Sequence, residues 1–225
     1  MKSLTQQAVQ IPAGSAILRG DLCVPPDAQG VVLFVHGSGS SRSSPRNIQV
    51  ARVLQQMRLA TLLFDLLTLE EERVDSVTRE HRFNITLLTE RLLHATRWVD
   101  TEAALRGMAL GYFGASTGSA AALAAAAQLG QRVSAVVSRG GRPDMVDAHQ
   151  LARVQAAVLL LVGSHDAEVL ELNRQAYLHL GGEKQLSMVA GASHLFEEPG
   201  TLDEVARLAA TWFNSHLRAG EREAV

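Results

Sequence analysis

The chain has 225 residues, of which 47% are hydrophobic and 20% are charged, and its formal net charge is −2. This size and composition are typical of one globular α/β domain, so we expect residues 1–225 to form a single domain. The nearly neutral charge, without any basic run, argues against nucleic acid or an anionic membrane as a partner.

The first two predicted elements are strands at residues 5–11 and 15–24, which we expect to form an antiparallel hairpin at a sheet edge. From residue 31 onward, short apolar runs alternate with segments of helical periodicity. Further strands are expected at residues 31–35, 60–64, 107–113, 133–137, 157–162 and 185–189. Helices are expected at residues 47–57, 85–105, 120–127, 145–153, 170–180 and 202–217, and residues 66–82 read as a charged connection. This alternation predicts an α/β fold with a mostly parallel, doubly wound sheet and helices on both faces.

The interpretation of function starts from a Gly-x-Ser-x-Gly motif, formed by Gly114, Ser116 and Gly118. A strand-like run precedes the motif, and seven alanines and one leucine fill residues 120–127 after it. In a nucleophile elbow, the serine occupies a strained turn between a strand and a helix, and its hydroxyl projects at the positive helix N-terminus. The sequence therefore predicts that Ser116 is a nucleophile. The alternative is a glycine-rich turn without chemistry.

A serine nucleophile needs a histidine base, and a carboxylate must position that histidine. In strand–elbow–helix enzymes, the chain order of these groups is serine, acid, histidine. Asp166 and His194 follow Ser116 in this order, and each comes directly after a predicted strand. We therefore predict a triad of Ser116, Asp166 and His194. Two alternatives stay open: Asp65, which also follows a strand, is the acid, or Asp166 and His194 are loop residues that only cap turns.

The predicted oxyanion hole consists of two backbone N–H groups. One belongs to Thr117, directly after the nucleophile, and the other is expected from the Gly- and Ser-rich loop at residues 36–41, where we favour Ser38. His36 is expected to hold this loop, and Gly37 is expected to let the backbone approach the substrate.

Arginines follow several of the predicted strands. Arg42 and Arg139 are the expected substrate contacts, and Arg46 and Arg142 lie on similar loops. These arginines either attract an anionic substrate or are solvated and ion-paired, and exposed arginines are more often the latter.

No metal and no cofactor are expected. The loop at residues 36–41 lacks the Gly-Lys-Ser/Thr ending of a P-loop and does not match Gly-x-Gly-x-x-Gly, and metal-ligand motifs are missing. The only cysteine, Cys23, cannot form an intramolecular disulfide, residues 1–10 lack the apolar core of a signal peptide, and no apolar run approaches the roughly 20 residues of a membrane helix. We therefore expect a cytoplasmic monomer or homodimer whose partner is a small-molecule ester.

Four motifs together resemble the α/β-hydrolase superfamily and, within it, the small dienelactone hydrolase-like group. They occupy residues 35–39, 114–118, 162–166 and 191–194. The resemblance implies hydrolysis of an ester or thioester through an acyl-enzyme on Ser116, without a cofactor. It also implies no substantial lid domain, because residues 139–156 are too few to form one. Dienelactone hydrolases carry Gly-x-Cys-x-Gly, so the serine at position 116 argues against a dienelactone as the substrate.

The expected function is that of a carboxylesterase-like serine hydrolase acting on small esters. A thioesterase or acyltransferase with the same triad stays open. Such an enzyme would differ from an esterase in the access of the acyl acceptor to the site. A catalytically silent binding protein also stays open, because a fold does not determine a function.

Overall fold

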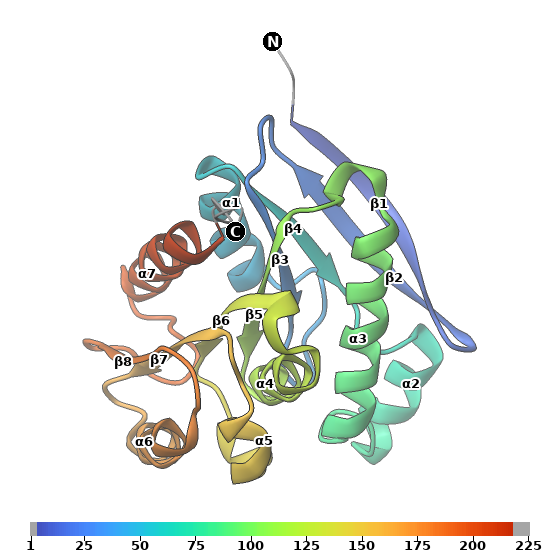
Figure 1. The fold of residues 1–225 in the computed structure, drawn as a ribbon. Coiled ribbons are helices and arrows are strands. Elements are labelled where there is room, and N and C mark those ends of the chain that lie inside the picture. The colour runs from blue at the N-terminus through green and yellow to red at the C-terminus, as the bar shows by residue number, and fades with distance from the viewer. Residues whose placement is uncertain (1–3, 218–225) are drawn as a thin grey trace.

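A central sheet organises the computed structural model, which describes residues 4–217 (Figure 1). Its strands are β1 (Thr5–Ala13), β2 (Ala16–Val24), β3 (Gly30–Val35), β4 (Leu59–Phe64), β5 (Ala109–Ala115), β6 (Val133–Arg139), β7 (Ala157–Gly163) and β8 (Lys184–Val189). They form an eight-stranded sheet in the order β1-β2-β4-β3-β5-β6-β7-β8. The β1–β2 and β2–β4 pairs are antiparallel, and every other pair is parallel. The predicted α/β sheet with an edge hairpin is therefore confirmed.

Helices cover both faces of this sheet (Figure 1). They are α1 (Pro45–Gln56), α2 (Leu69–Thr78), α3 (Ile85–Thr101), α4 (Thr117–Leu129), α5 (Ala148–Ala152), α6 (Ala167–His179) and α7 (Thr201–His216). Three-residue 3₁₀ helices lie at Ala103–Leu105, Gly130–Arg132 and Pro143–Met145. Helices α1 and α7 pack on one face, and α3 to α6 pack on the other.

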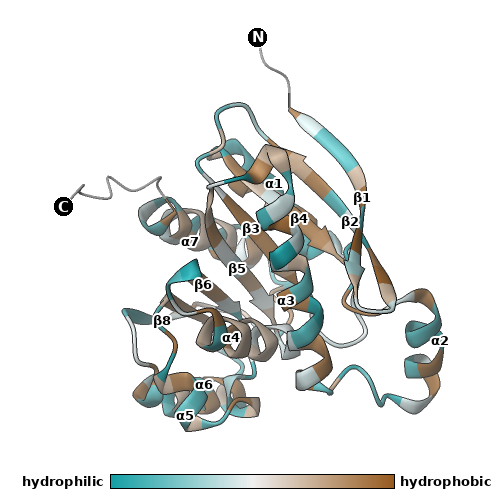
Figure 2. Cartoon of the chain, turned by 45° about the vertical axis from the view of Figure 1, so that its right-hand side comes forward, coloured by the Kyte–Doolittle hydropathy of each residue, from teal (hydrophilic) through white to brown (hydrophobic). Residues whose placement is uncertain are grey.

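Alternation along the strands divides the core into two layers. Val31, Leu33 and Val35 of β3 face α3 and α4, whereas Val32 and Phe34 face α1 and α7. All six residues of β3 are buried, as expected for a strand covered on both faces. Strands β3 and β4 are accordingly largely brown in Figure 2, whereas the edge strand β1 has hydrophilic stretches. Because the central strands are parallel, their carboxyl ends meet at one edge of the sheet, where ligand sites form in such folds.

The alanine-rich segment forms α4, which lies directly against the sheet. Ala120 to Ala127 are at most 5% exposed. Alanine is the best helix former, and its small side chain allows a helix to approach a sheet closely. This packing places the N-terminus of α4 at the carboxyl end of β5.

The segment between β4 and α3 contains a helix that the sequence interpretation missed. Residues 66–82 were expected to be a charged connection, but Leu69–Thr78 form α2. The Thr68 side chain accepts a hydrogen bond from the Glu71 backbone, and the Glu71 side chain accepts one from the Thr68 backbone. This capping box is visible in the sequence as Thr-x-x-Glu. Between residues 4 and 217, no helix is long and apolar enough to cross a membrane.

Candidate active site

Ser116 occupies the sharp turn between β5 and α4. Its backbone angles are φ 49° and ψ −124°, a region that a residue with a side chain rarely adopts. Hydrogen bonds hold this geometry: the Ser116 N–H donates to the Arg139 carbonyl at 3.1 Å, and the Ser116 carbonyl accepts from the Ser119 hydroxyl at 2.7 Å. The surrounding structure therefore maintains a strained turn at the predicted nucleophile.

The two glycines of the motif allow the close approach that this turn requires. A Cβ atom at position 114 would lie 2.5 Å from the Ser119 Cα, and one at position 118 would lie 2.1 Å from the Val35 carbonyl oxygen. Neither space accommodates a side chain, because real Cβ atoms do not approach other atoms so closely. The Gly-x-Ser-x-Gly pattern thus has a steric cause in this fold.

Asp166 and His194 are brought together at the ends of β7 and β8. His194 Nδ1 and Asp166 Oδ2 are 2.6 Å apart, and the Asp166 side chain is 14% exposed against 39% for His194. The two loops are also joined through their backbones, since the His165 N–H donates to the Ala192 carbonyl at 3.0 Å. A carboxylate at Nδ1 leaves Nε2 of the imidazole free to accept a proton, which is the arrangement a general base needs.

The turn after β6 links this pair to the nucleophile. The carbonyl of Arg139 accepts from the Ser116 N–H, and a Cβ atom on the next residue, Gly140, would lie 3.5 Å from Cε1 of His194. Ser116 and His194 therefore flank the same short turn. Among residues 4–217, no hydrogen bond joins the Ser116 hydroxyl to His194 in this state. Catalytic hydrogen bonds often tighten only when substrate binds.

The loop after β3 lies beside Ser116. A Cβ atom on Gly37 would be 3.0 Å from the Ser116 Cβ, so the peptide that carries the Ser38 N–H is adjacent to the nucleophile. Thr117 is the first residue of α4, and the first N–H groups of a helix have no partner within it. The structure thus places Ser38 and Thr117, the two residues predicted to supply oxyanion donors, close to Ser116 in the fold.

His36 fastens this loop to the loop after β4. Its Nδ1–H donates to the Gly37 carbonyl at 3.0 Å, and its Nε2 accepts from the Leu66 N–H at 3.0 Å. Both roles require the neutral ring, and burial lowers the pKa of His36. The contacts agree with the expectation that His36 holds the loop.

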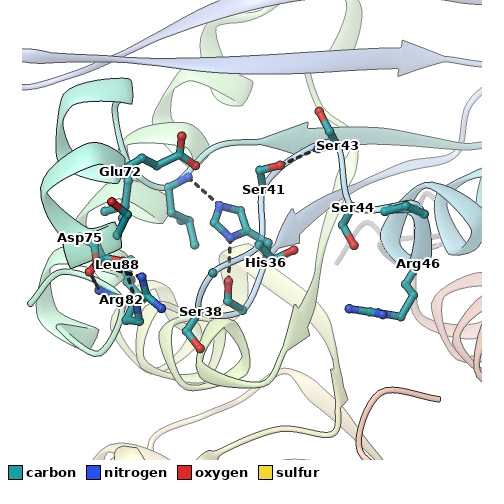
Figure 3. A pocket seen from close by; sticks show the side chains of 17 residues that line it. His36, Ser38, Ser41, Ser43, Ser44, Arg46, Glu72, Asp75, Arg82 and Leu88 are labelled. Carbon is teal, nitrogen blue, oxygen red and sulfur yellow. Dashed lines mark hydrogen bonds and ion pairs between the residues drawn. The ribbon is translucent and has the colours of Figure 1, made fainter. Parts of the chain in front are cut away.

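A cavity of about 730 Å³ opens next to this loop. Figure 3 shows His36 and Ser38 near its centre, Arg46 on the α1 side, and Glu72 and Arg82 on the α2 side. Ser116, Asp166 and His194 do not line it; Gly37 does, and Gly37 separates it from the nucleophile. The cavity is therefore separated from Ser116 by the Gly37 backbone, and neither Asp166 nor His194 lines it.

The α2 side of the cavity carries acidic groups that the sequence interpretation did not assign. Burial, followed by repulsion from Asp65, raises the pKa of Glu72. Burial also acts to raise the pKa of Asp75, but hydrogen bonds from Arg82 and His81 outweigh it, and the net shift is downward. The Asp75–Arg82 pair thus anchors the end of α2 beside the cavity.

Arg42 does not fit its expected role as a substrate contact. Its backbone N–H and its guanidinium both bind Asp65, and its Nε donates to Asp21 at 3.0 Å. Asp65 is 1% exposed and is also paired with Arg19, so it has no contact with the predicted base His194. Arg42 therefore neutralises a buried carboxylate, and Asp65 is not positioned as the acid of the triad.

Arg139, unlike Arg42, is directly bonded to the turn of Ser116, because its carbonyl accepts a hydrogen bond from the Ser116 N–H. It is the last residue of β6, it is 9% exposed, and its guanidinium carbon is 5.9 Å from the centre of the Phe196 ring. Burial and the charge of Arg46 lower its pKa to about 10.

Two curated relatives, from two strains of Mycobacterium tuberculosis, are each 52% identical to this chain over 214 residues and are named “Putative phosphoribosyl transferase”. The alignment covers 95% of this chain but 47% of each relative, so the chain spans about half the length of the curated relatives it matches. No protein-family model matches the chain.

Solved structures resemble the chain over nearly its whole length. A dienelactone hydrolase from Anabaena variabilis is 51% identical with a TM-score of 0.94, and the match covers 96% of this chain and 100% of that one. The esterase Est1E from Butyrivibrio proteoclasticus has a TM-score of 0.78 at 14% identity, with 92% and 98% of the two chains covered. A dienelactone hydrolase-like promiscuous phosphotriesterase from metagenomic libraries has a TM-score of 0.75 at 18% identity, with 96% and 100% covered. The last two show the common fold only.

Proposed function

The chain belongs to the dienelactone hydrolase-like group of the α/β-hydrolase superfamily, and from this premise we propose that it is a serine hydrolase that cleaves small carboxylic esters. The observation that carries the proposal is the 2.6 Å hydrogen bond between His194 and Asp166, placed across one short turn from the strained Ser116. A base oriented by a partly buried carboxylate beside a serine at a helix N-terminus is the arrangement that serine acyl transfer needs.

In the proposed mechanism, Nε2 of His194 takes the proton of the Ser116 hydroxyl as the oxygen attacks the ester carbonyl. Asp166 holds the imidazole through Nδ1 and stabilises the imidazolium. The N–H groups of Ser38 and Thr117 donate to the oxyanion, and His194 returns the proton to the leaving alcohol. A water molecule then attacks the acyl-enzyme with His194 as base, which releases the acid and restores Ser116.

The test is the hydrolysis of a series of 4-nitrophenyl esters of increasing acyl length. We expect Ser116→Ala to lower kcat by about 10⁶, to the background rate, because the nucleophile is lost. Ser215→Ala is the matched control, since Ser215 is an exposed serine on α7 whose hydroxyl donates to the Thr211 carbonyl at 3.1 Å. Equal activity of the parent and Ser116→Ala would show that Ser116 is not the nucleophile.

A fluorophosphonate probe separates a silent site from an unusual substrate preference. The proposal predicts that the parent reacts with the probe and that Ser116→Ala does not. A parent that neither hydrolyses esters nor reacts with the probe would instead be a binding protein of this fold.

A further inference from the structure

A buried arginine without a counter-ion lies next to the proposed nucleophile. Arg139 is 9% exposed, and its Nε and Nη1 atoms are buried without a hydrogen-bond acceptor. No carboxylate among residues 4–217 forms an ion pair with it. With a pKa of about 10, its guanidinium is still protonated at neutral pH. A buried charge without a partner strongly destabilises a fold, so this position calls for an anion.

A second arginine reaches the same loop, because Arg46 pairs with Glu197, the residue after Phe196. Arg46, at the start of α1, is close enough that its charge contributes to lowering the pKa of Arg139. The Nε of Arg46 is also buried without an acceptor, and its Nη1 donates to Glu197 at 3.0 Å. Glu197 therefore neutralises Arg46 but forms no ion pair with Arg139, which leaves a net charge of +1 for these three groups. One singly charged anion would balance them.

Arg139 and Arg46 both lie near groups of the proposed active site, so an anion that they bind could be part of the substrate. The Arg139 carbonyl accepts from the Ser116 N–H, and the Arg139 guanidinium lies at the ring of Phe196, two residues beyond His194. Arg46 lines the cavity together with Ser38, and its side chain extends toward the cavity from α1 (Figure 3). Arg139 is thus next to Ser116 along its backbone and to the loop of His194 through its side chain, and Arg46 lines the open space next to the oxyanion loop.

We propose that Arg139 and Arg46 form a subsite for a singly charged oxyanion on the substrate, such as a carboxylate, held near the ester bond that Ser116 attacks. The planar guanidinium of arginine presents its donors in a fork that matches carboxylate oxygens. Phe196 supports the Arg139 guanidinium through its ring face but offers no acceptor to the N–H groups. The subsite rests on the proposed esterase function and adds a charge requirement to it.

The experiment compares two esters of nearly equal length that differ in charge: 4-nitrophenyl pentanoate and the mono-4-nitrophenyl ester of succinic acid. We expect the parent to favour the anionic ester by at least about tenfold in kcat/KM, which is the size of effect that one charged contact provides. Arg139→Gln is expected to lower this ratio at least about tenfold, and Arg139→Lys to lower it less, because one charge is kept. Taking a ratio removes any general loss that a disturbed turn at Ser116 imposes on both esters.

Two further variants keep the test decisive. Arg153→Gln, at an exposed arginine after α5, is the matched control and leaves the ratio at the parent value. If Arg139→Gln fails to fold, Arg46→Gln, in the less buried partner, should still lower the ratio. A parent without preference for the anionic ester, or an Arg139→Gln variant with the parent's ratio, would overturn the subsite.

Binding can be measured without turnover. Succinate should raise the melting temperature of the parent and of Ser116→Ala, but not that of Arg139→Gln, at an ionic strength matched with sodium chloride. Inorganic phosphate in a parallel series distinguishes a phosphate preference from a carboxylate preference. If esters are not hydrolysed but succinate stabilises only proteins that keep Arg139, the serine hydrolase proposal fails and the subsite stands. Equal stabilisation of the parent and Arg139→Gln would refute the subsite.

Discussion

Replacing His36 by leucine tests the loop that is proposed to carry the oxyanion hole. The leucine side chain resembles histidine in size but can neither donate to the Gly37 carbonyl nor accept from the Leu66 N–H, two contacts of 3.0 Å each. Leu66 is 0% exposed, so water does not replace the lost acceptor. The change therefore removes two hydrogen bonds and leaves one buried donor unpaired.

The size of the effect follows from these contacts. The two hydrogen bonds contribute about 1 kcal/mol each, and the unpaired buried N–H costs about 1–3 kcal/mol, which together predict a loss of about 3–5 kcal/mol of unfolding free energy. For a chain of this length, 1 kcal/mol shifts the melting temperature by about 2–4 °C, so we expect a decrease of about 6–20 °C. His36→Gln, whose amide can both donate and accept, should lose less.

Thermal denaturation followed by circular dichroism measures the shift, and ester hydrolysis at a temperature where both proteins are folded measures the consequence for the site. We expect kcat to fall for His36→Leu, because the peptide that carries the Ser38 N–H is no longer held. A melting temperature within about 2 °C of the parent would refute the reasoning, since it would mean that the two contacts contribute almost nothing.

Three further predictions concern other charged groups of the site. Because burial lowers the pKa of His36, the unfolded chain takes up a proton on this residue at a higher pH than the folded chain does. In urea denaturation, the unfolding free energy should therefore be highest above about pH 6.5 and decline as the pH falls. His36→Leu should lack the part of this decline that is due to His36. Asp166→Asn should lower kcat by about 10⁴, measured on a short-chain ester, because it favours the wrong tautomer of His194. Arg42→Met should lower the unfolding free energy by about 3 kcal/mol in urea denaturation, because it leaves the buried Asp65 carboxylate undercompensated; an unchanged midpoint would contradict the role assigned to Arg42.

The order of the elements could be predicted from the sequence because each signal is local. Continuous apolar runs such as Val31–Val35 mark strands covered on both faces, and the fold confirms them. Asp166 and His194 follow from similar reasoning, since both come directly after strands whose carboxyl ends share one edge of the sheet. Their hydrogen bond is the contact that this reasoning anticipates.

Partners that come from distant strands could not be predicted in the same way. Arg42 binds Asp65 and Asp21, which are separated from it by 23 and 21 residues and approach it only because β2 and β4 are neighbours in the sheet. The burial of Arg139 likewise depends on Phe196, which reaches it from the loop after β8. Helix α2 differs from these cases, because its Thr-x-x-Glu capping box is a local sequence signal that predicts a helix start. The many charged residues of the segment instead favoured the interpretation as a connection.

The most direct test of the central claim is to trap the acyl-enzyme. The parent is mixed rapidly with excess 4-nitrophenyl acetate, quenched in acid, and analysed by mass spectrometry of the intact protein and of its peptides. The account predicts a mass increase of one acetyl group on the peptide that contains Ser116, and none in Ser116→Ala. Hydrolysis without an adduct on Ser116 in a protein quenched before the steady state, or an adduct on another residue such as Cys23, would contradict it.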